Sequence, residues 1–563
     1  MTALPSRVPG VLGNTSLSRF DAVIIGSGAG GGATALALTE AGLNVCILEA
    51  GPNYFQGLDD PAPGNPKPLF ANDELAMSSR KLIHQQARVE PRTFRPSEAD
   101  GKRTVIGEVN SLPKTVGGAW VHADMKVPRF QEFDFRLGSE LGDIPGAAFA
   151  DWPLSYAELE PFYAEAERIG GAQGLAGADP FEAWRSGPYP MRPGAPMFLS
   201  EVLSVGTRAL GLTAYPYPGL QNSRPYEGQP ACNDCGFCSG YGCSINAKGS
   251  VNHLRRALLS GRVQLRSECA AVRLVTDATG RTITQVEYLD PEGHLDNVAG
   301  DRIFLAASPI ESARLCLLSD PGGPGLGNSS GQLGRNLMFH HQTISPGVYP
   351  INFHGERGKS VSAGFSDWRG VPNDPDRPLG GIVEFGTNSE KIADAIQYAE
   401  LGFRGEELKS FLRSSPFGSH IAVLIMQGED APQSTNRIDL DPEVRDINGL
   451  PVPRITYQPH AFELRAREIY GPKMIELHGA SGAQFAFISP MYDGGKTPTG
   501  RHIMGTLRMG TDPRLSVVDA NCRFHDIGNL YSVDAGPFPT SSGYNPTLTL
   551  QALAIRTARA AAG

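Results

Sequence analysis

The sequence predicts an α/β fold, α+β overall, built around a Rossmann-like nucleotide-binding unit. Residues 20–48 read as a strand, a glycine turn, a helix and a second strand, which is the order of elements in that unit. Residues 303–318 read as a buried strand that runs directly into a helix, and residues 546–562 as a closing helix. Residues 263–286 alternate apolar and polar side chains, as strands joined by a turn do.

Three glycines follow the first apolar strand directly. Gly26 would make the tight turn, Gly28 would let a pyrophosphate approach the backbone, and Gly31 would let the helix pack on the strand. The second strand ends at Glu49, 23 residues after Gly26, where a carboxylate can accept from ribose hydroxyls. This spacing favours a dinucleotide site over an unrelated glycine turn, but it does not choose between NAD and FAD.

Composition narrows the class of protein. The 563 residues are 40% hydrophobic and 19% charged, which is typical of a globular chain with several domains. The net charge is −9 and no run of Lys and Arg stands out, so we expect no nucleic-acid partner. No apolar run reaches the roughly 18–20 residues of a membrane span, and no signal pattern opens the chain. We therefore expect a cytoplasmic protein that is not membrane-spanning, exported only if a partner subunit carries it.

The C-terminal part carries the most distinctive motifs. They are HIMGTLRMG at residues 502–510, SVVDANCRFHDIGNLYSVDAG at 516–536 and SSGYNPTLTLQALAIRTA at 541–558. On these motifs the chain resembles the glucose–methanol–choline (GMC) family of FAD oxidoreductases over nearly its whole length. The resemblance implies FAD rather than NAD, with His502 and Asn545 beside the flavin as catalytic residues. It also implies cofactor contacts at Ala50, Asp534, Ala535, Pro546 and Thr547.

A second segment, VGGAWVHADMKVPRF at residues 116–130, points to one branch of that family. It resembles the flavin loop of the sugar-oxidising branch, which includes pyranose 2-oxidase and bacterial FAD glucose or glucoside dehydrogenases. The resemblance places Gly117 and Gly118 at the cofactor and leaves a covalent link from FAD to His122 open. Ala123 departs from the pattern, because the sugar enzymes often have Trp here and other members have Asn.

The resemblance implies oxidation of an alcohol, with hydride passing to flavin N5. His502 is suited to take the hydroxyl proton near pH 7, and Asn545 could hold the substrate oxygen. The favoured substrate is a ring hydroxyl or the anomeric centre of a sugar or glycoside. The alternatives are an oxidase or dehydrogenase of a non-sugar alcohol (a sterol or long-chain alcohol), an NAD dehydrogenase, and a flavin-binding protein without redox turnover. His340 and His341 are interpreted as packing or loop contacts.

Four of the eight cysteines form a C-x2-C-x2-C-x4-C pattern: Cys232, Cys235, Cys238 and Cys243. The first three have the spacing of a bacterial ferredoxin loop, while the last gap is longer and Ser replaces the following Pro. A [3Fe–4S] or [4Fe–4S] cluster is the favoured interpretation, since dehydrogenases of the resembling branch carry a cluster in a comparable loop and pass electrons to a partner protein or small subunit. Zinc is the second interpretation, although two separated C-x2-C pairs are missing. Disulfides or free thiols are the third.

The resemblance also implies two discontinuous domains. The FAD-binding domain would comprise residues 1–59, 106–133, 227–338 and 488–563, including the cysteine loop. A sheet-based substrate-binding domain would comprise residues 60–105, 134–226 and 339–487, which carry no recognisable motif.

Overall fold

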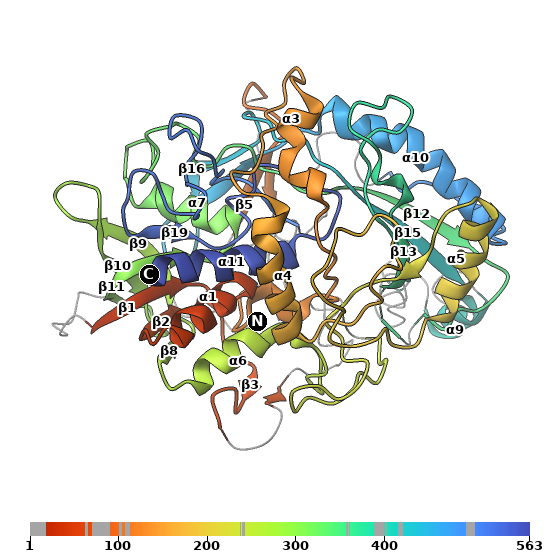
Figure 1. Ribbon diagram of the computed structural model, residues 1–563, viewed down its shortest axis with the longest axis horizontal. Coiled ribbons are helices and arrows are strands. Elements are labelled where there is room, and N and C mark those ends of the chain that lie inside the picture. The colour runs from red at the N-terminus through yellow and green to blue at the C-terminus, as the bar shows by residue number, and fades with distance from the viewer. Residues whose placement is uncertain are drawn as a thin grey trace.

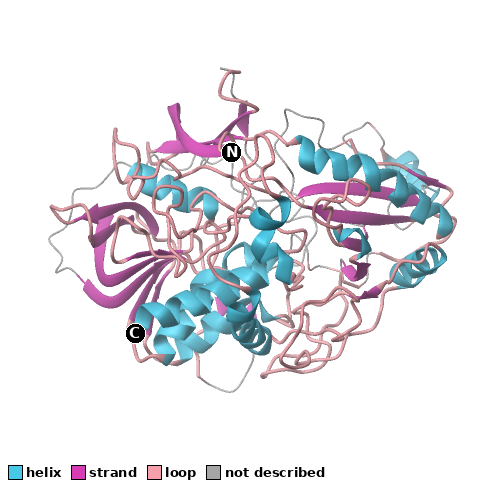
Figure 2. Cartoon of the chain, turned by 45° about the horizontal axis from the view of Figure 1, so that its top comes forward, coloured by secondary structure: helices cyan, strands magenta, loops and turns pink. Residues whose placement is uncertain are grey.

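The computed structural model contains two large β-sheets, a smaller third sheet, and helices packed against them (Figures 1 and 2). It describes residues 18–61, 66–69, 91–100, 104–106, 113–236, 238, 242–355, 358–359, 361–387, 399, 402, 404–414, 420–490 and 502–563. Residues 1–17, on which the expectation of a cytoplasmic location partly rests, lie outside these ranges.

The first sheet is mostly parallel. Its order is β8–β2–β1–β11–β10–β9, with β19 beside β11. The strands are β1 (Ser18–Ile25), β2 (Val45–Leu48), β8 (Val263–Arg266), β9 (Ala270–Thr276), β10 (Ile283–Leu289), β11 (Leu295–Leu305) and β19 (Leu530–Ser532). β1 runs parallel to β2 and β11, and β2 runs parallel to β8, whereas β10 is antiparallel to β9 and β11. The predicted α/β class with a Rossmann-like unit is confirmed.

Four helices gather beside this sheet (Figure 1): α1 (Ala29–Glu40), α4 (Tyr156–Gly170), α6 (Asn252–Leu259) and α11 (Thr547–Ala562). α1 contacts both α6 and α11, and α4 contacts α11. The sequence of α1, AGGGATALALTE, consists mostly of small residues, which lets its neighbours approach closely. A Cβ on Gly32 would lie 3.2 Å from the Leu254 backbone in α6. The last helix of the chain therefore lies against the first.

The second large sheet is antiparallel, in the order β18–β12–β15–β14–β13–β7. Its strands are β7 (Tyr215–Pro216), β12 (His341–Val348), β13 (Val361–Phe365), β14 (Val383–Thr387), β15 (Ile421–Gly428) and β18 (Phe485–Ala486). Helices α5 (Phe198–Ala209) and α10 (Ala461–Ala480) pack together and against this sheet (Figure 1). The buried core between them includes Leu199, Leu203, Phe385, Leu424 and Met474.

A four-stranded sheet, β16–β17–β5–β6, lies against α7 (Pro309–Leu318), which also contacts β9 of the first sheet. Its strands are β5 (Arg92–Arg95), β6 (Thr104–Ile106), β16 (Arg437–Arg445) and β17 (Pro451–Thr456). The remaining elements are β3 (Phe55–Gln56), β4 (Lys67–Pro68), η1 (Gly118–His122), η2 (Glu132–Arg136), α3 (Leu137–Leu141), η3 (Gly249–Val251), η4 (Asp367–Arg369) and α9 (Gly405–Ser414).

The domain boundaries drawn from the sequence stay a prediction. α4 lies in the range assigned to the substrate-binding domain, and it packs on α11 of the predicted FAD-binding domain.

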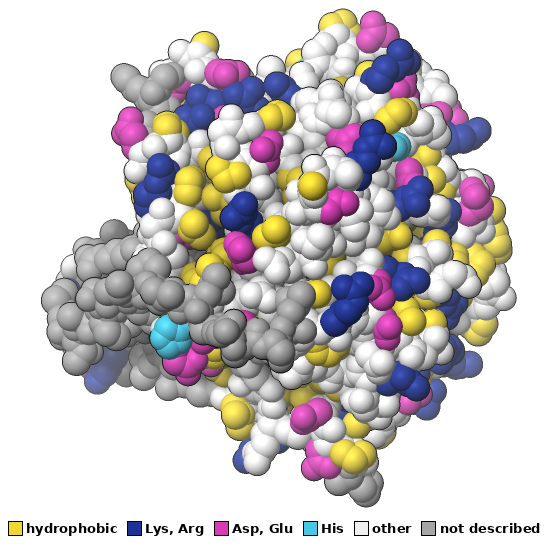
Figure 3. All heavy atoms as spheres, turned by 90° about the vertical axis from the view of Figure 1, so that its left-hand side faces the viewer, with side chains coloured by type: hydrophobic (Ala, Val, Ile, Leu, Met, Phe, Trp, Pro, Cys, Tyr) yellow, Lys and Arg dark blue, Asp and Glu magenta, His cyan; other side chains and the backbone are white. Residues whose placement is uncertain are grey.

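Within the described part of the chain, the helices are too short or too polar to cross a bilayer. On the face shown in Figure 3, basic and acidic side chains are interspersed.

Candidate active site

A cavity of about 550 Å³ extends from the first glycine turn to the C-terminal histidine motif. Twelve of the fourteen residues predicted from the sequence to bind the cofactor or to act in catalysis line it: Gly26, Gly28, Glu49, Ala50, Gly118, His122, His502, Asp534, Ala535, Asn545, Pro546 and Thr547. Gly31 and Gly117 do not line it, but each supports residues that do. Segments separated by about 500 residues in the sequence thus form one wall.

The glycine turn leaves no room for side chains. Gly26 has a φ of +102°, and a Cβ there would lie 2.4 Å from the carbonyl oxygen of Ala306. A Cβ on Gly31 would lie 2.0 Å from the carbonyl oxygen of Gly26. Gly31 therefore allows α1 to begin directly on the turn, so that the helix N-terminus, with its free N–H groups, faces the cavity.

The Glu49 carboxylate is fixed by three hydrogen bonds. The backbone N–H and the hydroxyl of Ser27 donate to Glu49 Oε2 over 2.9 and 2.6 Å, and the N–H of Gly51 donates to Oε1 over 2.9 Å. Burial raises the pKa of Glu49, and these hydrogen bonds oppose the rise. The carboxylate is thus held at the end of β2 as an acceptor facing the cavity.

The segment around η1 docks on this turn. The N–H of Gly117 donates to Ser27 Oγ over 3.0 Å. Gly118 has a φ of +63°, and a Cβ there would lie 2.7 Å from Cα of Gly28. At the end of η1, His122 is buried in the cavity wall. The structure therefore brings the two glycine segments into direct contact.

Asp534 is held in the wall at the end of β19. Ser312 Oγ donates to Asp534 Oδ2, and the N–H of Gly536 donates to Oδ1 over 2.8 Å. Burial raises the pKa of this carboxyl group to about 6. Ala535, Pro546 and Thr547 line the same wall.

His502 and Asn545 meet at the other end of the cavity. Their Nε2 and Nδ2 atoms are 3.5 Å apart. Burial, together with the neighbouring His340 and Lys126, holds the pKa of His502 well below its usual value. His502 is therefore neutral near pH 7 and can accept a proton.

Two partners fix the Asn545 amide. Tyr217 OH donates to Asn545 Oδ1, and Asn545 Nδ2 donates to Glu384 Oε1 over 3.0 Å. Because the amide oxygen is occupied by Tyr217, the group that Asn545 can offer to a ligand is an N–H. Neither Tyr217 nor Glu384 was identified from the sequence, since each is an isolated polar residue in an otherwise ordinary strand region.

A cation lies beside this pair. Lys126 Nζ forms ion pairs with Glu384 and, over 3.0 Å, with Asp124 Oδ2. These two carboxylates raise the pKa of Lys126 although burial opposes them, so the side chain stays charged. Lys126 and Asp124 line the cavity and belong to the flavin-loop motif, but the sequence did not indicate a role for either.

His340 is more than the packing contact that the sequence suggested. Its Nδ1 lies 2.8 Å from Nδ1 of His502, so it touches the predicted base directly. Gln342 and Gln427, whose amides are hydrogen-bonded over 2.8 Å, line the cavity on the side of the second sheet. The region around His502 is therefore rich in polar side chains.

FAD fits this cavity by the chemistry of its wall. The glycine backbone N–H groups at the N-terminus of α1 can bind a pyrophosphate, and the Glu49 carboxylate can accept hydrogen bonds from ribose hydroxyls. The continuous wall then reaches His502, which suits an extended cofactor with its reactive ring at that end.

The four loop cysteines are free of disulfides. Burial raises the pKa of Cys232 to about 11 and that of Cys238 to about 12. Lys248 Nζ donates to the carbonyl oxygens of Ala123, over 2.8 Å, and Cys238, over 3.5 Å. The loop thus adjoins the segment that carries His122.

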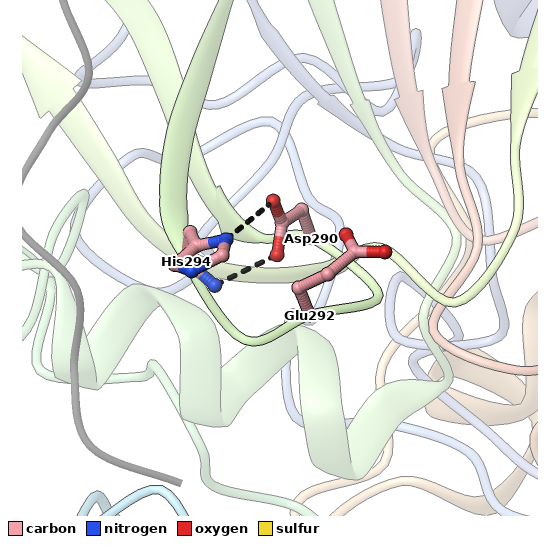
Figure 4. Close-up of side chains that lie close together, drawn as sticks. All are labelled: Asp290, Glu292 and His294. Carbon is pink, nitrogen blue, oxygen red and sulfur yellow. Dashed lines mark hydrogen bonds and ion pairs between the residues drawn. The ribbon is translucent and has the colours of Figure 1, made fainter.

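Among the described residues, the group whose potential ligand atoms all lie within 4.8 Å of one another is Asp290, Glu292 and His294. Figure 4 shows these side chains on the turn between β10 and β11. None of them lines the cavity.

Fold and cavity together define a flavin-dependent oxidoreductase. A family model described as an FAD binding domain matches residues 21–56, and one described as GMC oxidoreductase matches residues 432–554. A 2-methyl-1,2-propanediol dehydrogenase from Mycolicibacterium austroafricanum is 30% identical over 96% of this chain and 95% of its own. The chain belongs to the GMC oxidoreductase family and is an FAD-dependent enzyme that oxidises alcohols.

Two further relatives align along nearly their whole length. A gluconate 2-dehydrogenase flavoprotein from Pantoea cypripedii is 27% identical over 99% of this chain and 95% of its own. A fructose dehydrogenase large subunit from Gluconobacter japonicus is 28% identical over 98% of both chains.

Proposed function

We propose that the protein is a dehydrogenase that oxidises a ring hydroxyl or the anomeric centre of a sugar, glycoside or similar polyol. The observation that carries this proposal is the polar wall around His502, where Lys126, Asp124, Gln342 and Gln427 line the cavity. Such side chains can hydrogen-bond several hydroxyls at once, whereas a sterol or long-chain alcohol would need a mainly apolar wall.

His502 acts as the base in this proposal. Bound FAD supplies the hydride acceptor. When substrate binds, the Asn545 N–H that faces His502 Nε2 donates to the substrate oxygen instead, and Lys126 stabilises negative charge that develops there. As the O–H bond breaks, the proton moves to His502 Nε2, which the low pKa of this side chain leaves available.

The names of the relatives support the substrate class. A propanediol, gluconate and fructose all carry more than one hydroxyl group, and each relative covers nearly the whole of this chain. A flavin-binding protein without turnover would have no use for the neutral His502 held against Asn545.

A panel of substrates without an added electron acceptor tests the proposal. Hexoses, glycosides, sugar acids and short diols should bleach the flavin absorbance under anaerobic conditions, and a sterol and a long-chain alcohol should not. Bleaching by the apolar alcohols alone would move the function to the non-sugar alternative, and bleaching by none of the panel would oppose redox turnover of alcohols of these classes.

We further propose the cysteine loop as the exit for electrons, through an iron–sulfur cluster to a partner protein, with zinc as the alternative occupant. Support comes from the four free thiols on one loop and from Lys248, which joins the loop to Ala123. Iron and acid-labile sulfide in amounts matching the flavin are expected. Zinc without iron would make the loop structural and leave an external acceptor to reoxidise the flavin directly.

Attachment of FAD to His122 is decided by acid precipitation, since covalent flavin stays with the pellet and free flavin leaves it. His122→Ala then shows whether loss of the covalent link also lowers turnover.

A cytoplasmic location, or export with a partner subunit, is part of the same proposal and is tested by cell fractionation.

A further inference from the structure

The contact between His502 and His340 constrains where their protons lie. The two Nδ1 atoms are 2.8 Å apart, with the rings edge to face at 80°. A hydrogen bond between two ring nitrogens needs one donor and one acceptor. One of the two rings therefore carries a hydrogen on Nδ1 and the other does not.

The far side of His340 decides which ring is the donor. His340 Nε2 lies 3.4 Å from the carbonyl oxygen of Ser541, and a carbonyl can only accept. His340 Nε2 must then carry the hydrogen. Burial holds the pKa of His340 at about 4, so the ring is neutral and has one N–H. Its Nδ1 is bare and accepts. The side chain of Gln427 also bonds to this ring, but an amide can donate or accept and does not change the assignment.

We propose that His340 is a positioning residue that fixes the tautomer of His502. It accepts the Nδ1–H of His502, which leaves His502 Nε2 bare and directed at Asn545. This inference rests on the proposed role of His502 as the base. When the substrate O–H bond breaks, the new N–H bond forms at Nε2, the Nδ1–H stays in place, and its hydrogen bond to His340 stabilises the imidazolium.

The segment whose carbonyl orients His340 is held by its side-chain hydroxyls. Ser541 Oγ donates to Glu429 Oε1 over 2.7 Å and accepts from the N–H of Asp430 over 2.9 Å. The next residue, Ser542, has a φ of +60° and donates from Oγ to Asp134 Oδ2 over 2.9 Å. A non-glycine residue in this conformation persists only where its surroundings enforce it. The direction of the Ser541 carbonyl is thus built into the fold.

The tautomers can be read directly from the resting holoenzyme. Nitrogen-15 NMR of protein labelled at histidine separates bare from protonated ring nitrogens, and His502→Gln and His340→Asn assign the two rings. We expect Nδ1–H with bare Nε2 for His502, and the reverse for His340. A hydrogen on Nε2 of His502 would overturn the inference about the tautomer, whereas the separate proposal that His502 is the base would still stand.

Variants of His340 test the consequence for turnover. His340→Leu removes the acceptor and should lower kcat about 10- to 100-fold with little change in KM, the range for a hydrogen bond to a charged group. His340→Asn should keep most of the activity, because its Oδ1 can accept in place of Nδ1. The control is His341→Leu, since His341 lies near Arg467 and does not line the cavity.

Equal losses in the Leu and Asn variants, or no loss in either, would refute the inference. If the Leu variant fails to fold, the Asn variant and the NMR spectrum still decide. If His502→Gln keeps full activity, the base proposal fails, whereas the tautomer assignment remains measurable by NMR.

Discussion

Removing the charge of Glu384 tests how the polar end of the cavity is held together. The Glu384 side chain is fully buried and binds both Lys126 and Asn545. Glu384→Gln keeps the shape and keeps an oxygen that can accept from Asn545, but it takes one of two carboxylates away from a buried cation.

The expected loss follows from the geometry. Breaking a buried ion pair costs about 3–5 kcal/mol, because the remaining charge is left without its partner. Asp124 remains 3.0 Å from Lys126, so we expect the lower end, about 3 kcal/mol of unfolding free energy. Because Glu384→Gln leaves more of the positive charge of Lys126 uncompensated, it should also lower the pKa of His502 further. The acid limb of the pH profile of kcat/KM should then move to lower pH.

A double-mutant cycle measures the pair itself. Urea unfolding of the wild type, Glu384→Gln, Lys126→Met and the double variant should give a coupling of at least about 1.5 kcal/mol. Glu468→Gln, whose carboxylate lies 3.9 Å from Arg465 on the surface, should change stability by less than about 0.5 kcal/mol. A coupling below about 0.5 kcal/mol would show that Lys126 and Glu384 do not depend on each other.

Three other outcomes are expected. His502→Gln should lower kcat about 10²- to 10⁴-fold with normal flavin content by absorbance, and near-normal turnover would place the base elsewhere. Gly118→Val puts a Cβ 2.7 Å from the Gly28 backbone at a φ of +63° and should abolish FAD binding, unlike Gly187→Val, where nothing lies within 4 Å. His478 is buried with a pKa of about 4, below the unfolded value of about 6.5, so only the unfolded chain gains its proton between these values. The free energy of unfolding should therefore fall by about 3 kcal/mol from this residue as pH drops from about 6.5 to 4. His478→Gln should flatten the dependence of this free energy on pH in that window, measured by urea unfolding. The control, His294→Gln at an exposed residue, should not.

The nucleotide end of the site could be predicted because its signal is local. The glycines and Glu49 lie within one strand–helix–strand unit, so their spacing reflects their geometry. His502 and Asn545 were reached through motifs of the resembling family, and the structure places them 3.5 Å apart.

The supports of that pair could not be predicted. Glu384 lies on β14 and Tyr217 directly follows β7, and no periodic pattern marks a buried carboxylate or phenol among exposed ones. His340 was interpreted as a packing or loop contact, because its contact with His502 is made across 162 residues and leaves no local pattern. Such contacts depend on how sheets pack, which local spacing does not encode.

The packing of α11 on α1, with β19 beside β11, has a consequence for biosynthesis. The glycine turn leaves the ribosome early, but the part of the cavity wall from Asp534 to Thr547 is translated some 500 residues later. The nascent chain must therefore carry an open, incomplete binding surface through most of its synthesis, exposed to aggregation or chaperones. Flavin loading then becomes a late maturation event, and a ribosome-bound fragment ending before residue 530 should retain no flavin.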